Sequence, residues 1–240
     1  MVSDHGEMNM EARQVWKNSM REASERVPFL VAGPGIPQGM VVEELTSLVD
    51  VYPTLTQLAG GVVEQWMDGY SVLDLIHKHA TPSQTDALLR HNLLPPQQAA
   101  RPPFVLSMYM SNMGNTEAFM IRDESTPGKQ HKLITFGTQS FPWFNQSAYP
   151  PQLFELNSDP HELHNLAPLQ PEVVHALNRS MQALFPTSDI HLFAANENRE
   201  IFETYIFHKN AKGNNDTLRR NMEAAYKGFD AQDWNQVQLW

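Results

Sequence analysis

The 240-residue chain contains no cysteine. This stretch of polypeptide therefore has no disulfide framework, no thiolate zinc site and no cysteine nucleophile of its own. It also lacks any apolar run close to the ~20 residues that cross a bilayer, and we expect no signal peptide in its opening residues. What remains is an ordinary composition, 41% hydrophobic and 18% charged. It predicts a globular fold of one domain or slightly more.

Basic residues are scarce as well. The formal net charge is −10, and lysine and arginine form no dense run. This balance argues against nucleic acid or an anionic membrane surface as a partner. An anionic substrate would be repelled at long range, so individual cations at a site would have to hold it. No pattern in the sequence predicts an oligomeric state.

The residues with the most chemical content come at the start of the chain. Asp4 and His5 are adjacent and are followed by Gly6. An acid and an imidazole at the tip of a strand can deliver two metal ligands, a hard oxygen and a ring nitrogen, and a glycine lets the chain turn away without a Cβ. Lys17 could bring a positive charge to the same cleft. The pattern predicts a site for an anion, although an isolated Asp-His-Gly can also be a simple turn in which the aspartate caps a helix.

The segments that follow indicate an α/β architecture. Residues 8–26 lack proline and glycine and favour a helix or helical loop, in which Arg13, Lys17 and Arg21 would share one face. The apolar run 27–32 predicts a buried strand of a parallel sheet.

A helix is predicted after Asp50, with Pro53 in its first turn and Gly60 at its end. Its apolar residues Leu55, Leu58 and Ala59 are expected to face inward. An amphipathic segment lies within 61–80. Residues 81–103, rich in proline, glutamine and threonine, indicate a connector or long loop between two parts of the chain.

Beyond the connector the pattern changes to short apolar segments separated by turn residues. Such a pattern predicts an antiparallel sheet, and an amphipathic helix is predicted after it. The four strand-sized segments are 104–110, 117–122, 131–136 and 152–156, the helix spans 171–185, and a helical tail covers 186–240.

Three Asn-X-Ser/Thr sequons begin at Asn145, Asn178 and Asn215. They would carry glycans only if the protein entered the secretory route. Sequons arise often by chance, so each is equally well explained as an unmodified asparagine.

Five motifs occur in a fixed order along the chain, and together they resemble the C-terminal part of the type I sulfatases. The similarity runs from about residue 2 to about residue 185. The motifs are Ser3-Asp4-His5-Gly6, Lys17, Arg26-Val27-Pro28, the segment 47–60 and the segment 153–167.

The resemblance implies a fold. Residues 1–95 would form the C-terminal part of an alkaline-phosphatase-like α/β/α sandwich, whose N-terminal half lies outside this chain. Residues 96–185 would form a small subdomain with a four-stranded antiparallel sheet and a helix, and 186–240 a helical tail.

The resemblance also implies a chemistry. In this family a cysteine becomes formylglycine, whose hydrate attacks the sulfate sulfur, and calcium with basic side chains neutralises the sulfate oxygens. Asp4 and His5 would be metal ligands, and Lys17 the catalytic, sulfate-binding cation. The substrate would be a sulfated carbohydrate or aryl sulfate, such as the 2-sulfate of a uronic acid in glycosaminoglycans, and the location lysosomal or extracellular.

Since formylglycine belongs to the family's N-terminal half, we expect this chain to be inactive alone. Two ligands do not hold calcium, which prefers ~6–8 oxygens. Two other hypotheses stay open: a metal-dependent phosphoesterase of the same superfamily, because an Asp-His pair also suits zinc or manganese, and a non-catalytic module.

Overall fold

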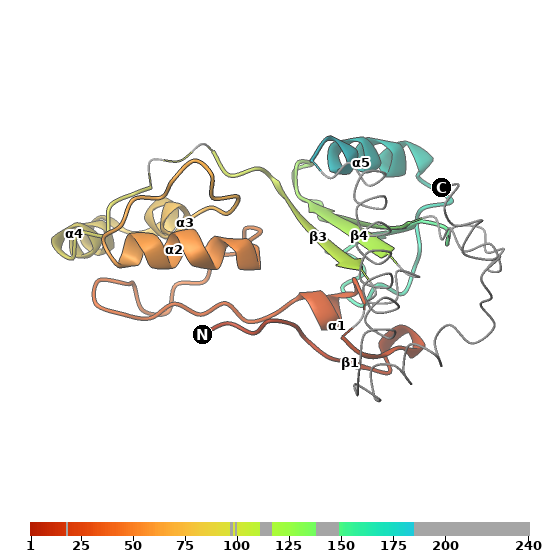
Figure 1. The fold of residues 1–240 in the computed structure, drawn as a ribbon, viewed down its shortest axis with the longest axis horizontal. Helices are drawn as coiled ribbons and strands as arrows, with labels where there is room; N and C mark the ends of the chain where they lie inside the picture. Colours follow the sequence, from red (N-terminus) through yellow and green to blue (C-terminus); the bar gives the residue numbers. More distant parts are fainter. Residues whose placement is uncertain (18, 97, 99, 111–116, 138–148, 185–240) are drawn as a thin grey trace, which may run out of the picture.

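The computed structural model describes residues 1–184 except 18, 97, 99, 111–116 and 138–148. Figure 1 shows a helical part and a sheet-bearing part side by side, with the opening segment of the chain running along both. The predicted tail 186–240 and the sequons at Asn145 and Asn215 lie outside the described residues. Asn178 is on a described helix, with its side chain half-buried.

The sheet-bearing part contains the four-stranded antiparallel sheet that the sequence predicts, with the strands in chain order. Alternate side chains point to opposite faces of such a sheet, and both faces are covered here. Phe119 and Ile121 face the helix α5 and pack with its Leu177 and Met181. The elements are β3 (Phe104–Met110), β4 (Glu117–Asp123), β5 (His131–Phe136), β6 (Gln152–Glu155) and α5 (Pro171–Leu184).

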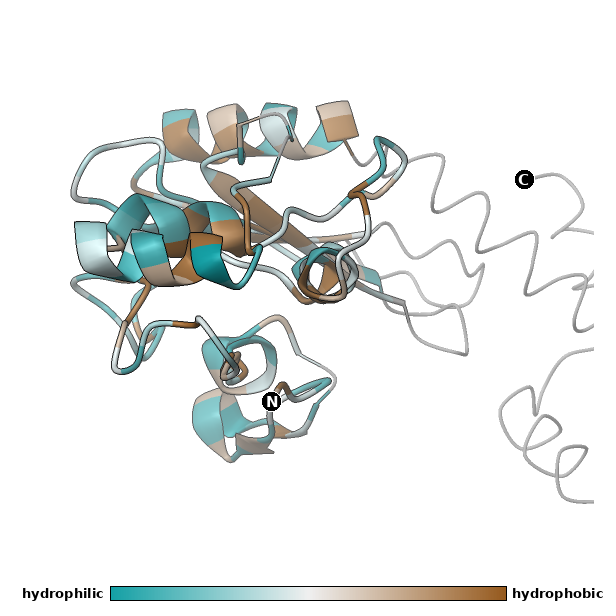
Figure 2. Ribbon diagram, turned by 90° about the vertical axis from the view of Figure 1, so that its left-hand side faces the viewer, coloured by the Kyte–Doolittle hydropathy of each residue, from teal (hydrophilic) through white to brown (hydrophobic). Residues whose placement is uncertain are grey.

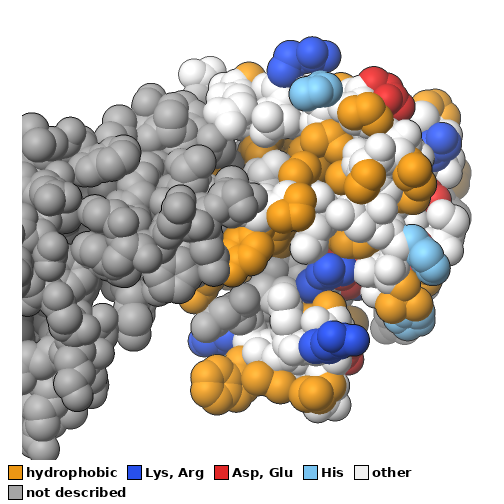
Figure 3. All heavy atoms as spheres, turned by 90° about the vertical axis from the view of Figure 1, so that its right-hand side faces the viewer, with side chains coloured by type: hydrophobic (Ala, Val, Ile, Leu, Met, Phe, Trp, Pro, Cys, Tyr) orange, Lys and Arg blue, Asp and Glu red, His pale blue; other side chains and the backbone are white. Residues whose placement is uncertain are grey.

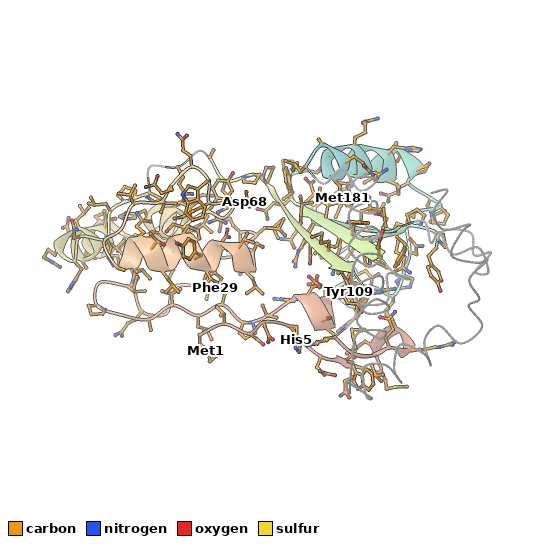
Figure 4. The ribbon with its side chains drawn as sticks, in the orientation of Figure 1. Met1, His5, Phe29, Asp68, Tyr109 and Met181 are labelled. Carbon is orange, nitrogen blue, oxygen red and sulfur yellow. The ribbon has the colours of Figure 1, made fainter. Side chains whose placement is uncertain are left out.

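The apolar stripe of α5 is visible in Figure 2, and Figure 4 shows Met181 between this helix and the sheet. The opposite face of the sheet carries Met120, Ile134 and Phe154, which pack against Met20 of the opening segment. The second face of the sheet is therefore covered by the opening segment of the chain, which is far away in sequence.

The helical part surrounds a second core. Leu73, Ile76 and Leu88 are buried there and contact Phe29 from the opening segment. The elements are η2 (Leu48–Asp50), α2 (Val51–Leu58), α3 (Leu73–His79) and α4 (Pro82–Arg90). Among the described residues, no helix combines the length and hydrophobicity that crossing a membrane requires.

The prediction of a loop over 81–103 is wrong at its start, because α4 lies there. Thr81 and Gln84 form a capping box, and Pro82 occupies the first turn. Proline and a hydroxyl residue are favoured at this end of a helix. The residues that indicated a loop are therefore the ones that begin the helix.

The prediction for α2 is partly wrong. Gly60, with φ of +81°, ends the helix as expected, and Leu58 packs on the core. Leu55 is 58% exposed, however, and Ala59 is exposed too. Pro53 and Thr54 take the inward positions instead.

The helix predicted over 8–26 is also wrong. Met10, Ala12, Arg13 and Trp16 all have positive φ, which fits tight turns and not a continuous helix. Arg13, Lys17 and Arg21 consequently do not share a helical face. The segment contains β1 (Met8–Asn9), η1 (Glu11–Arg13), β2 (Val15–Trp16) and the short helix α1 (Glu22–Glu25).

The run 27–32 is not the buried parallel strand that its apolar residues predict. Phe29 makes an isolated antiparallel bridge with Val2, and Leu30 N donates to Met1 O at 2.8 Å. Leu30 is 56% exposed. A strand of a parallel sheet is buried because helices cover both faces of the sheet, whereas within the described residues this run makes only an isolated antiparallel bridge.

Candidate functional site

The structure brings the three site residues of the sequence analysis together. His5 Nε2 lies 3.0 Å from Lys17 Nζ and 3.6 Å from Asp4 Oδ2. Figure 4 shows His5 on the opening segment, below the sheet-bearing part. The hairpin β1–β2, in which Met8 is opposite Trp16, returns the chain so that Lys17 comes back to His5.

The orientation of the His5 ring is fixed by its neighbours. Nδ1 lies 2.8 Å from the carbonyl oxygen of Gly6. A carbonyl only accepts, so Nδ1 carries the proton of the neutral ring. The lone pair of Nε2 then faces the Lys17 ammonium group, and this is also the tautomer that a metal ligand needs.

Asp4 is suited to remain ionised. Its carboxylate is 86% exposed and accepts from His5 N at 3.1 Å. Hydrogen bonding from its own backbone, the adjacent His5 and more weakly Lys17 lower the pKa of Asp4. A carboxylate must lose its proton to bind a metal.

These three residues line one end of a cleft with a volume of about 760 Å³. The cleft lies between the opening segment, residues 41–48 and the sheet. It is also lined by charged residues that sequence reasoning did not assign to the site: Glu22, Glu25, Arg26, Glu43, Glu44 and Arg122. The only signal was Arg26, which belongs to a motif of the family resemblance.

Two charged residues that line this cleft, Glu22 and Arg122, are neutralised by nearby charges. Lys132 is fully buried, with its Nζ at 2.9 Å from Glu22 and 3.0 Å from Glu162. Arg122 also pairs with Glu22, at 3.1 Å. Burial alone would raise the pKa of Glu22, but Lys132 and Arg122 outweigh it and lower the pKa. Lys132 and Arg122 are therefore already paired with carboxylates, whereas Lys17, which lines the cleft, contacts the ring of His5.

Glu25 behaves differently. Burial raises the pKa of Glu25, although a hydrogen bond with Ser107 opposes the rise.

Figure 3 shows that lysine and arginine side chains stand apart on the sheet-bearing end of the molecule. The described residues on that face form no continuous basic area of the kind that binds a polyanion.

The donors fit a divalent metal in type but are too few. Asp4 offers a carboxylate oxygen and His5 a neutral ring nitrogen. Within the part of the chain that the structure describes, no three acidic or histidine side chains are grouped for a metal ion. Since calcium prefers ~6–8 oxygen ligands, these two residues supply part of such a site at most.

Comparison with known proteins gives a consistent result. The sequence profile of the family Sulfatase matches residues 1–62. Arylsulfatase K of Gallus gallus is 36% identical over 201 residues, which are 84% of this chain and 33% of that protein. Arylsulfatase K of Homo sapiens is 34% identical over 200 residues, 83% of this chain and 33% of that protein. The chain spans about a third of the length of the curated relatives it matches.

Two solved structures share the fold. One is the Bacteroides fragilis protein yidJ, described as a sulfatase, with a TM-score of 0.54 and 17% identity over 78% of this chain and 35% of that one. The other, solved with its substrate D-glucosamine-2-N,6-O-disulfate, has a TM-score of 0.55 and 18% identity over 79% of this chain and 35% of that one. The α/β fold predicted from the resemblance is thus confirmed. The start of the chain thus matches the sulfatase family, and most of its length is similar in sequence to arylsulfatase K.

Proposed function

We propose that the full-length protein is a sulfatase that hydrolyses a sulfate ester of a carbohydrate, and that Asp4, His5 and Lys17 form part of its active site. The observation that carries the proposal is the 3.0 Å approach of Lys17 Nζ to His5 Nε2, beside an ionised Asp4. In a chain similar to sulfatases, an ammonium group and two potential metal donors thus line one cleft.

Each of the three residues has a role in this proposal. Lys17 would bind a sulfate oxygen and stabilise the negative charge that grows on it in the transition state. Asp4 and His5 would be two of the calcium ligands, and bound calcium would supply further neutralisation of the sulfate oxygens. Because the single lone pair of His5 Nε2 serves one partner at a time, calcium would replace Lys17 at this nitrogen and leave the ammonium group for the sulfate. The remaining ligands and the formylglycine nucleophile are expected from polypeptide outside these 240 residues, so this chain alone would be inactive.

The substrate we propose to test first is the 2-sulfate of a uronic acid in glycosaminoglycans, which the family resemblance suggests. Similarity to arylsulfatase K supports a sulfate ester. A structural neighbour solved with a disulfated glucosamine supports a sulfated sugar. We place the protein in the lysosome or outside the cell, where such polymers are found.

The exposed apolar side chains of the helical part fit a larger catalytic domain. Many large apolar side chains left exposed in one part of a chain indicate a face that packs against other polypeptide. We propose that the rest of the sulfatase domain covers this surface. It includes Val2, Leu30, Val41, Leu48, Val49, Tyr52, Leu55 and Trp66.

The test uses the purified full-length gene product. It is assayed on a 2-sulfated uronate disaccharide, a 6-sulfated glucosamine, an aryl sulfate and an aryl phosphate, each with and without a chelator. We expect hydrolysis of at least one sulfate ester, lost on chelation and restored by calcium. Faster cleavage of the phosphate with zinc or manganese would make the protein a phosphoesterase. No hydrolysis of any of the four would favour a non-catalytic module.

A further inference from the structure

Ser24 connects the two segments that carry His5 and Lys17. It is 1% exposed and lies on α1. Its carbonyl oxygen accepts a hydrogen bond from Gly6 N at 2.7 Å, and its hydroxyl donates to the carbonyl oxygen of Lys17. A single buried residue therefore holds the backbone next to His5 and the backbone of Lys17 itself.

Gly6 is required by this contact and not by a turn. A Cβ at position 6 would lie 2.0 Å from Ala23 O and 3.2 Å from Ser24 O. Such distances are impossible without moving one backbone away from the other. The opening segment is thus packed directly on α1, and the expectation that Gly6 mainly allows the chain to turn is replaced by a close approach of two backbones.

The helix α1 is itself held firmly against the sheet. Besides the ion pairs of Glu22 with Lys132 and Arg122, Glu22 N donates to Glu162 Oε2 at 2.9 Å. Arg21 donates to the carbonyl oxygen of Glu162 at 2.7 Å. These contacts from Arg21 and Glu22 fix the N-terminal end of α1 against the sheet and the segment around Glu162.

We propose that Ser24 is a positioning residue that sets the distance between His5 and Lys17, using α1 as a rigid support on the sheet. The significance of that distance for catalysis rests on the proposed function. The geometric claim does not, because it concerns only residues of this chain and can be measured without turnover.

The experiment is NMR spectroscopy of the 240-residue chain, comparing wild type, Ser24→Ala and Ser24→Thr. In Ser24→Ala we expect the NOE between the His5 ring and the Lys17 side chain to lose more than half its intensity. The amide of Ser19, which donates to Lys17 O at 2.8 Å, should exchange about five to ten times faster, the effect of losing one hydrogen bond. Ser24→Thr keeps the hydroxyl and should restore both signals.

The control is Ser71→Ala. Ser71 is also fully buried, and its hydroxyl accepts from Leu73 N at 3.4 Å, in the helical part. This variant should leave the His5–Lys17 NOE unchanged. An unchanged NOE and unchanged Ser19 exchange in folded Ser24→Ala, or equal changes in Ser71→Ala, would overturn the proposal.

A second measurement serves if Ser24→Ala does not fold. In the wild-type chain, the amide hydrogens of Gly6 and Ser19 should exchange with solvent through the same local opening as the amide of Arg26. The Arg26 amide donates to Glu22 O at 2.8 Å in α1. Gly6 and Ser19 amides that exchange at least tenfold faster than Arg26 would show that α1 does not hold them. An inactive full-length protein with these NMR results intact would reject the sulfatase proposal alone.

Discussion

The sheet-bearing part and the helical part differ in how their apolar surfaces are covered. The sheet is covered on one face by α5 and on the other by the opening segment around Met20. The helical part has a compact core, but most exposed large hydrophobic side chains of the described residues precede residue 95. The sheet-bearing part has thus completed its own core, whereas the helical part has the character of one layer in a larger fold.

The two parts also use buried charge differently. In the sheet-bearing part, Lys132 pairs with Glu22 and Glu162 and joins segments more than a hundred residues apart. In the helical part, Arg101 pairs with Asp50 at 2.6 Å and Asp74 at 3.2 Å. The first network attaches the opening segment of the chain to the sheet, and the second joins the starts of two helices.

The largest expected effect is that of Lys132→Ala. It leaves Glu22 and Glu162 buried without their cation, and such losses lower the free energy of unfolding by about 3–5 kcal/mol. Urea denaturation of the 240-residue chain, followed by circular dichroism, measures it. Lys78→Ala, which removes an exposed partner of Glu44, is the control and should leave the midpoint almost unchanged. Equal midpoints for both variants would contradict the importance of the buried network.

Arg101→Ala should have the next largest effect. Asp50 is 2% exposed, and the guanidinium also donates to Tyr70 O at 3.1 Å. We expect a loss of about 3 kcal/mol, concentrated in the helical part. Hydrogen exchange measures which part of the molecule loses this stability. Arg101→Lys should recover only part of the loss, because an ammonium group lacks the planar fork. A loss of protection spread evenly over β3–β6 would contradict the claim that separate charge networks stabilise the helical part and the sheet-bearing part.

Leu55→Ser tests the uncovered surface directly. On the 240-residue chain we expect less than about 0.5 kcal/mol of change, as for other exposed positions, together with better solubility. Leu177→Ser, at a buried position of α5, is the matched comparison and should strongly destabilise. In the full-length protein Leu55→Ser should lower the melting temperature. No such drop there would mean that this surface is open to solvent.

The smallest effect concerns Glu44. Hydrogen bonds from Lys78 and His79 outweigh the opposing effect of burial and lower its pKa to about 2 from an ordinary 4.5. A carboxylate with a depressed pKa stabilises the fold above its unfolded pKa, and this is lost as pH falls from 4.5 towards 2. Glu44→Gln should flatten this part of the stability profile, as measured by urea midpoints at pH 5 and pH 3. If the urea midpoints of the wild type and Glu44→Gln changed equally between pH 5 and pH 3, a stabilising role for the ion pairs of Glu44 would be rejected.

The structure shows which features the sequence could predict. The strands were predictable because their apolar and turn residues alternate locally, and β5 has the predicted bounds of 131–136. The opening segment was not. Its positive φ values at Met10 and Trp16 belong to a hairpin. The residues between the two strands, 10–14, include no glycine, proline, asparagine or aspartate that would have indicated a turn.

The proximity of the candidate site residues could also be predicted from the sequence. Asp4, His5 and Lys17 were proposed because they belong to motifs in a fixed order, and the structure brings them together. Ser24 and Glu22 were missed because their roles depend on contacts with residues far away in sequence, such as Lys132 in a strand. A lysine inside an apolar strand was the one available sign of a buried partner.

The most direct measurement of the central claim is kcat/KM for sulfate-ester hydrolysis by the full-length protein carrying Lys17→Ala. Arg13→Ala, which removes an exposed cation of the same segment, is the control. We predict a loss of about 100-fold or more for Lys17→Ala, as for other groups that stabilise transition-state charge, and less than a twofold change for Arg13→Ala. Equal activity in the two variants would contradict a role for Lys17 in holding the sulfate.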